Sequence, residues 1–258
     1  MQAATTRRTV LRLAGGAALL ACAGENPARP ALAQEASPVA TPAGGSGLLG
    51  KHVVVRLRTV KPGRSVDELL AMIQAEFVPL IKEVPGLIWY VAGANEDERL
   101  QFSVGVYQDA EGIAASNQRA GAWGEQGAAN FVQGNPEIYT GVIGVAAEPD
   151  LAGGLMGKYL VVRLREPSPD WPVNKVMGLI DDGYVPLVRE IPGFIAYFGS
   201  SDGEAGAQAY VGVFDDQAGA DESTRIAGEW LTENDYAFFT GEPTVAEGVI
   251  GAAAAAAE

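Results

Sequence analysis

Hydrophobic and polar positions follow a pattern that occurs twice along the chain, at an offset of 107 residues. Residues 77–90 read FVPLIKEVPGLIWY, and residues 184–197 read YVPLVREIPGFIAY. Each stretch is typical of the end of an amphipathic helix, a Pro-Gly stop and the start of a buried strand. The offset holds without a gap from Lys51, which matches Lys158, to Gly144, which matches Gly251. An internal repeat of this length predicts two units of the same fold.

Within each repeat, the periodicity predicts the order strand, helix, strand, strand, helix, strand. Alternating β-branched residues predict strands, and apolar residues at steps of three and four predict helices that cover a sheet. In repeat 1 the predicted strands are residues 53–58, 87–92, 100–107 and 138–146, and the predicted helices are residues 66–84 and 110–126.

Short polar and proline signals are expected to start, bend and end these elements. Ser65 and Asp109 are the expected N-caps of the two helices. Pro79 and its counterpart Pro186 fall inside the first helix of each copy, where each removes a backbone hydrogen bond and should produce a kink. Asn135-Pro136 is expected to form the turn before the last strand of repeat 1.

The two faces of the first strand differ in character. Val53, Val55 and Leu57 lie on one face, and His52, Val54, Arg56 and Arg58 lie on the other. One face of each sheet takes its helices, and the partly apolar face that remains needs a second sheet. We therefore expect an α+β fold, in which two ferredoxin-like βαββαβ repeats pack sheet to sheet as an intramolecular pseudo-dimeric α+β barrel. The expected divisions are repeat 1 (51–147), a connector (148–157), repeat 2 (158–252) and a tail (253–258).

The first 33 residues have the features of an export signal. The stretch Thr6-Arg7-Arg8-Thr9-Val10-Leu11-Arg12 resembles the twin-arginine motif. The apolar run at residues 13–23 is shorter than the ~20 residues that span a bilayer. This resemblance implies a protein exported by the twin-arginine route, extracytoplasmic, and either secreted or associated with the cell envelope.

Two processing sites remain possible for this signal. Ala31-Leu32-Ala33 before Gln34 fits the small-x-small rule of signal peptidase, which would release the protein. Leu19-Leu20-Ala21-Cys22 resembles a lipoprotein box, which would place a lipid on Cys22 and hold the protein at a membrane. Residues 34–50 are rich in Pro, Ala, Gly and Ser, which predicts a disordered linker.

Composition excludes several classes of function. The formal net charge of −14 repels nucleic-acid phosphates, so nucleic acid is not an expected partner. Cys22 is the single cysteine and His52 the single histidine, so neither an intrachain disulfide nor a Cys/His metal site is expected. No glycine-rich loop has a nucleotide-binding fingerprint. We therefore expect no metal and no cofactor.

The strand spacing and the helix end Val-Pro-Leu…Pro-Gly-(Phe/Leu)-Ile resemble the dimeric α+β barrel superfamily, in its antibiotic-biosynthesis-monooxygenase-like (ABM-like) branch. The resemblance covers both repeats, about 200 residues. It implies a small enzyme that oxidises polyketide-like aromatic molecules without metal or flavin, in a pocket between the sheet and the helices. Relatives build this pocket with Asn, Trp and His or Arg. Here Ser116 and Ser223 stand where relatives commonly carry His.

The candidate pocket residues are those that both copies share, together with the single histidine: Arg56, Arg163, Tyr90, Tyr197, Trp123, Trp230 and His52. The arginines are expected to line the barrel interior and bind an anionic or enolic ligand, or else to pair with Asp or Glu across the interface between the repeats.

Two functions are consistent with these residues. One is a cofactor-independent monooxygenase-like enzyme that acts on a small aromatic or polyketide-like molecule. The other is a non-catalytic module that binds or senses a small ligand outside the cytoplasm. Both predict a cavity of about 300 Å³ or more, lined by Tyr, Trp and Arg, in at least one repeat.

Overall fold

The computed structural model describes residues 47–147, 154–203 and 206–255. The predicted twin-arginine signal, the two alternative processing sites and residues 34–46 of the predicted linker lie outside the described residues, as do residues 148–153 of the connector and 256–258 of the tail.

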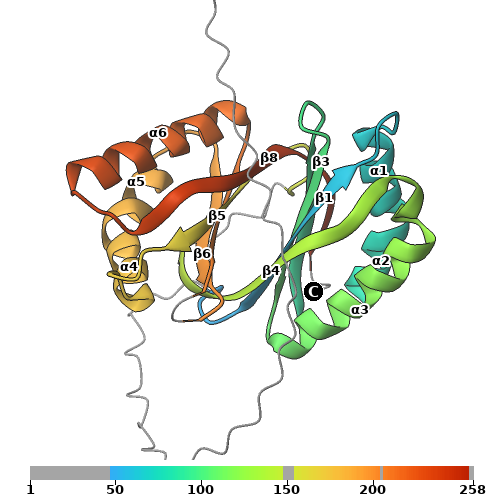
Figure 1. The fold of residues 1–258 in the computed structure, drawn as a ribbon, viewed down its shortest axis with the longest axis horizontal. Helices are drawn as coiled ribbons and strands as arrows, with labels where there is room; N and C mark the ends of the chain where they lie inside the picture. The colour runs from blue at the N-terminus through green and yellow to red at the C-terminus, as the bar shows by residue number, and fades with distance from the viewer. Residues whose placement is uncertain (1–46, 148–153, 204–205, 256–258) are drawn as a thin grey trace, which may run out of the picture. The chain divides into compact units, whose positions relative to one another are not determined.

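Eight strands of the described residues form a closed antiparallel barrel in the order β1-β3-β2-β8-β5-β7-β6-β4 (Figure 1). The strands of repeat 1 join those of repeat 2 along two seams, β2 with β8 and β4 with β6. The predicted α+β fold, with two repeats paired as an intramolecular barrel, is confirmed. The strands are β1 (His52–Val60), β2 (Leu87–Asn95), β3 (Leu100–Tyr107), β4 (Val132–Ala147), β5 (Tyr159–Pro167), β6 (Phe194–Ser201), β7 (Gln208–Phe214) and β8 (Phe239–Ala255).

Helices cover the outer face of each half of the barrel (Figure 1). In repeat 1 they are α1 (Val66–Met72), η1 (Ile73–Phe77), α2 (Val78–Lys82), α3 (Ala110–Gln126) and η2 (Ala128–Asn130). In repeat 2 they are α4 (Val173–Leu179), η3 (Ile180–Tyr184), α5 (Val185–Arg189) and α6 (Gln217–Glu233). In this described part of the chain, every helix is too short or too polar to span a membrane.

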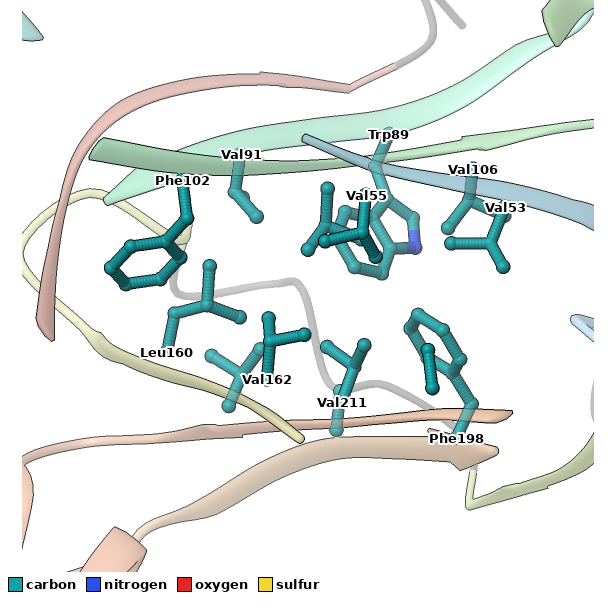
Figure 2. Close-up of a cluster of buried hydrophobic side chains, with 14 of the residues drawn as sticks. Val53, Val55, Trp89, Val91, Phe102, Val106, Leu160, Val162, Phe198 and Val211 are labelled. Carbon is teal, nitrogen blue, oxygen red and sulfur yellow. The ribbon is translucent and has the colours of Figure 1, made fainter. Parts of the chain in front are cut away.

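The barrel interior is a packed apolar core. Figure 2 shows side chains of the two halves pointing toward one another, among them Val53 and Val55 on one side and Leu160 and Phe198 on the other. The ring centroids of Trp89 and Phe198 lie 5.8 Å apart across this core. Because both sheets bury their inner faces here, neither half can leave the pair without exposing these residues to water.

Two leucines extend this core beyond the predicted limits of the repeats. Leu48 is 4% exposed and Leu155 is 7% exposed, and both pack into the barrel core. They occupy matching positions in the two copies, although the predicted divisions place Leu48 in the disordered linker and Leu155 in the connector. At the other end of the chain, β8 continues to Ala255 and pairs there with Trp89 of β2. Burial of single apolar side chains thus orders segments that their composition alone predicts to be irregular.

The predicted first helix is divided into three segments in each copy. Ser65 caps it as expected, since its side chain accepts a hydrogen bond from the Glu68 N–H at 3.3 Å. A π-helical turn, η1 or η3, then ends two residues before Pro79 or Pro186. Proline has no N–H to donate and its ring would clash with the preceding turn. A wider turn at this place accommodates both effects without ending the helix.

The expected turn at Asn135-Pro136 is wrong, because both residues lie inside β4. Their segment lies opposite a register shift in β1 between Leu57 and Thr59. Gly134 has a φ of +68°, which a glycine adopts without strain. A bulge leaves residues out of the hydrogen-bonded ladder, so a proline fits there without losing a bond.

Candidate functional site

The first strand of each repeat turns its arginines toward the helices. Val53 and Val55 belong to the core inside the barrel, whereas Val54 packs with α1 and its neighbours. Because side chains alternate along a strand, Arg56 shares the outer face with Val54. The expectation that the arginines line the barrel interior is therefore wrong.

Arg56 is 2% exposed and is held by neutral side chains. Its Nη2 donates to Ser116 Oγ at 2.8 Å and to Asn117 Oδ1 at 2.7 Å. The Tyr107 hydroxyl also donates to Ser116 Oγ, at 2.8 Å. The alternative expectation, a pairing with Asp or Glu, is wrong as well for this arginine.

Two nitrogens of the same guanidinium, Nε and Nη1 of Arg56, are buried without a hydrogen-bond partner in the protein. Burial lowers the pKa of Arg56, and nearby Tyr107 and Tyr90 act in the opposite direction. A buried guanidinium that lacks both a carboxylate and two hydrogen-bond acceptors is energetically unfavourable. This side chain is therefore suited to bind an anionic acceptor.

Arg56 lines a small cavity between the sheet and the helices of repeat 1. The volume of this cavity is about 20 Å³, room for one water-sized group and far below the expected 300 Å³. A larger hollow of about 480 Å³ is open to solvent on α6, and neither Tyr nor Trp lines it. The lining of the small cavity consists of Arg56, Arg58, Ile73, Phe77, Tyr90, Gln101, Ser103, Ala120 and Trp123.

Two aromatic side chains of this lining have defined roles. Burial raises the pKa of Tyr90 to about 12, with Arg56 opposing the shift, so the phenol stays protonated at neutral pH and can donate a hydrogen bond. Trp123 is half-buried, and its Nε1 donates to Glu76 Oε2 at 3.3 Å. Its ring lies 5.1 Å from that of Phe77. Trp123 therefore forms the outer wall of the cavity.

Repeat 2 has a different arrangement at the matching place. Ser103 of repeat 1 corresponds to Tyr210, whose buried ring packs 5.5 Å from Phe239 and whose hydroxyl donates to Gln208. Arg163 is only half-buried and donates to Thr224 and, at 3.4 Å, to Ser223 Oγ. The Tyr210 ring thus takes up space that Ser103 leaves open in repeat 1.

The remaining candidates lie apart from the cavity. Tyr197 is buried against Tyr184 at 5.3 Å, and Trp230 packs 5.2 Å from Tyr236, both in repeat 2. His52 is the first residue of β1, about 13 Å along the strand from Arg56, and does not line the cavity. Of the seven candidates, the structure brings together Arg56, Tyr90 and Trp123.

Sequence reasoning missed four residues of this site: Tyr107, Asn117, Gln101 and Ser103. Three of them stand where the two copies differ, since Phe214, Thr224 and Tyr210 replace Tyr107, Asn117 and Ser103. A search restricted to shared positions cannot find them. In the described ranges, no group of three or more His, Cys, Asp or Glu residues could hold a metal ion.

No family model and no curated protein matches this sequence. Several solved structures share its fold. A proposed monooxygenase from Fusobacterium nucleatum subsp. nucleatum ATCC 25586 has 14% identity and a TM-score of 0.62, over 80% of this chain and 95% of its own. A proposed monooxygenase from Lactobacillus acidophilus NCFM has 10% identity and a TM-score of 0.58, with the same coverage. An anthrone oxidase-like protein has 13% identity and a TM-score of 0.54, over 81% of this chain and 94% of its own.

At these identities the likeness shows the fold alone. The protein has a dimeric α+β barrel fold, with both halves supplied by one chain.

Proposed function

We propose that this protein is an exported ABM-like enzyme that oxidises a small aromatic or polyketide-like molecule with O₂, without a cofactor, in repeat 1. The observation that carries the proposal is Arg56, a buried guanidinium with two unpaired nitrogens at a cavity between sheet and helices. Proteins of the same fold include two described as proposed monooxygenases and one as anthrone oxidase-like, which supports the class of reaction.

In this proposal Arg56 binds the oxygen of the substrate. One of its two unpaired nitrogens donates to a phenolate or enolate oxygen, and the buried positive charge favours that ionised form. The Tyr90 hydroxyl is a second donor. The ionised substrate is electron-rich enough to reduce O₂ itself, which is why the reaction needs no cofactor.

The overall reaction balances for an anthrone-type substrate. The ring CH₂ group loses two hydrogens and becomes a carbonyl. One atom of O₂ enters that carbonyl, and the other leaves as water with the two hydrogens. The four electrons that reduce O₂ come from the substrate.

A substrate of this size requires the cavity to open. Trp123 is the side chain that can move, because it is half-exposed. To move, it must break the hydrogen bond to Glu76 and the ring contact with Phe77. Ala120 on the same helix adds little bulk at the cavity. We propose that Trp123 turns outward when the substrate enters.

Oxygen uptake with a panel of hydroquinones and anthrones tests the enzyme. We expect uptake with at least one compound, a loss of at least tenfold in Arg56→Gln, and little change in the matched variant Arg163→Gln. Equal losses in the two variants, or uptake that Arg56→Gln leaves unchanged, would contradict the assignment to repeat 1.

Binding without turnover is the second candidate function. It is favoured because the lining of the cavity contains no Asp, Glu or His that could act as a general base. Calorimetric titration with the same panel separates the two functions. Saturable binding that requires Arg56, with no oxygen uptake from any compound, would leave only the sensing or sequestering role.

Export is a separate part of the proposal. Replacing the arginine pair by lysines (Arg7→Lys with Arg8→Lys) should retain the protein in the cytoplasm. Cys22→Ala should leave the protein in the soluble extracytoplasmic fraction if cleavage follows Ala33. A change from membrane to soluble fraction in Cys22→Ala would instead establish lipidation.

A further inference from the structure

We propose that the cavity of repeat 1 is a binding site for a single halide ion, chloride in particular, held by the guanidinium of Arg56. This inference goes beyond the proposed function and does not depend on turnover. It follows from the charge, the donors and the size of the cavity, each of which restricts the occupant.

The charge of the lining is positive. Arg56 and Arg58 both line the cavity, and its remaining lining residues are neutral. Glu76 contacts the outer wall through Trp123 Nε1 at 3.3 Å, but this carboxylate is exposed to solvent. Burial lowers the pKa of Arg58, and repulsion from Arg56 adds to that effect. Two cations that line one small cavity are stabilised by an anion bound between them.

The donors are already in place. Nε and Nη1 of Arg56 are buried and unpaired, while Nη2 is held by Ser116 and Asn117. The two bonds to Nη2 hold the guanidinium in place. Because Nε–H and Nη1–H point in different directions, the ion accepts from one of these two nitrogens. Gln101 and Ser103, 3% and 4% exposed, add an amide and a hydroxyl to the lining.

The size of the cavity selects a monatomic ion. Its volume is about 20 Å³, and a water-sized guest needs roughly 10–15 Å³. Phosphate, sulfate and carboxylates are polyatomic and exceed this space unless Trp123 moves. Water has the right size but carries no charge to balance Arg56. Repeat 2 has Tyr210 at the matching position and a half-buried Arg163, so one site per chain is expected.

Thermal unfolding of the full chain in sodium chloride, compared with sodium gluconate at equal ionic strength, tests this site. Above the dissociation constant, each tenfold rise in chloride should raise the Tm by about 3–5 °C, since the ion binds only the folded state. Gluconate is too large for the cavity and should have no such effect. Arg163→Gln should respond to chloride as the wild type does, and Arg56→Gln should not respond.

Two further measurements keep the test decisive if Arg56→Gln fails to fold. Ser103→Val fills the cavity with a residue suited to a strand and should abolish the chloride response. Crystals grown in sodium bromide should show one anomalous peak within hydrogen-bond distance of Arg56. Equal Tm values in chloride and gluconate, or a cavity that holds only water in bromide, would overturn the halide site. No hydroquinone or anthrone is present in these measurements, so their outcome is independent of the oxygen-uptake assay.

Discussion

Arg56 and Arg163 occupy the same position in two copies of one fold, and their surroundings make them different. Arg56 is buried beside the small Ser103, with two nitrogens unpaired. Arg163 is half-buried, in a repeat where Tyr210 takes the place of Ser103. The larger side chain of Tyr210, together with the replacement of Tyr107 and Asn117 by Phe214 and Thr224, thus separates a site with an unmatched charge from a filled one. Function at the residue scale follows from what surrounds the arginine rather than from the arginine itself.

The serines on the second helix of each copy should differ in their contribution to stability. Ser116 Oγ accepts from Arg56 and from the Tyr107 hydroxyl, whereas Ser223 Oγ donates to the Ala220 carbonyl of its own helix at 2.9 Å. Ser116→Ala leaves two buried donors short of an acceptor and should lower the free energy of unfolding by about 2–4 kcal/mol. Ser223→Ala should lower it by less than about 1 kcal/mol. Urea denaturation of both variants measures the difference, and equal losses would contradict the network described here.

Tyr90 should make the protein sensitive to alkali. Its pKa is about 12 in the folded state, against an ordinary value of 10.0, because burial disfavours the phenolate. Because this pKa is raised, the protonated Tyr90 phenol stabilises the folded state fully below pH 10. This stabilisation is lost as the pH rises from 10 to 12. The free energy of unfolding should fall by about 2–3 kcal/mol through the ionisation of Tyr90.

Tyr90→Phe is the control for this pH dependence. The free energy of unfolding of this variant should fall less steeply than that of the wild type between pH 10 and 12. Tyr139 and Tyr210 also have a raised pKa through burial, so some alkaline loss should remain. Parallel curves for the variant and the wild type would show that Tyr90 is not responsible.

At the scale of elements, the local sequence pattern predicted where helices start and which way strand residues face. It did not predict the irregular turns and bulges, because these depend on contacts with neighbouring elements. Asp109 caps α3 as predicted, accepting from the Gly112 N–H at 2.9 Å, and α3 spans the predicted residues 110–126. The π turn before Pro79 and the bulge at Pro136 were not predicted, because each depends on how a wider turn or a neighbouring strand accommodates the proline. Local periodicity carries no information about either.

Gly248, the first glycine of the Gly-Val-Ile-Gly motif in repeat 2, leaves no room for a side chain at the seam between the repeats. A Cβ on Gly248 would lie 2.0 Å from the Ala94 carbonyl oxygen, across the β8–β2 pairing. Gly248→Ala should therefore lower the free energy of unfolding by about 1–3 kcal/mol or more. Gly121 on the exposed face of α3 has open space, so Gly121→Ala should raise it by roughly 0.5–1 kcal/mol. Chemical denaturation distinguishes the opposite signs, and a neutral Gly248→Ala would contradict the close approach.

At the scale of the whole barrel, the two repeats depend on each other. The β2–β8 and β4–β6 seams join them, and the interior core takes side chains from both. A half by itself would expose two strand edges and one apolar sheet face to water.

Separating the halves within residues 148–157 tests this dependence. Expressed alone, each half should aggregate or form homodimers, and together the halves should reassociate in a 1:1 complex. Size-exclusion chromatography with light scattering gives the masses. Two soluble monomers that do not interact would contradict the shared core.

The sequence by itself determined the tandem architecture of this protein. The repeat, the alternation on β1 and the apolar stripe on the first helix are local patterns, and each required a partner sheet. From these the closed barrel could be predicted. Three residues that line the cavity between the sheet and the helices of repeat 1 could be predicted as well: Arg56, Tyr90 and Trp123.

Only the tertiary structure decided which repeat holds a site and how large it is. Cavity volume depends on how side chains from distant elements pack, and Ser103 and Tyr210 look equally compatible with a strand in the sequence. The order of Leu48 and the unpaired nitrogens of Arg56 are likewise consequences of contacts across the fold. The local sequence pattern specifies on which face of a strand or helix a residue lies, whereas tertiary packing specifies which side chains contact that face.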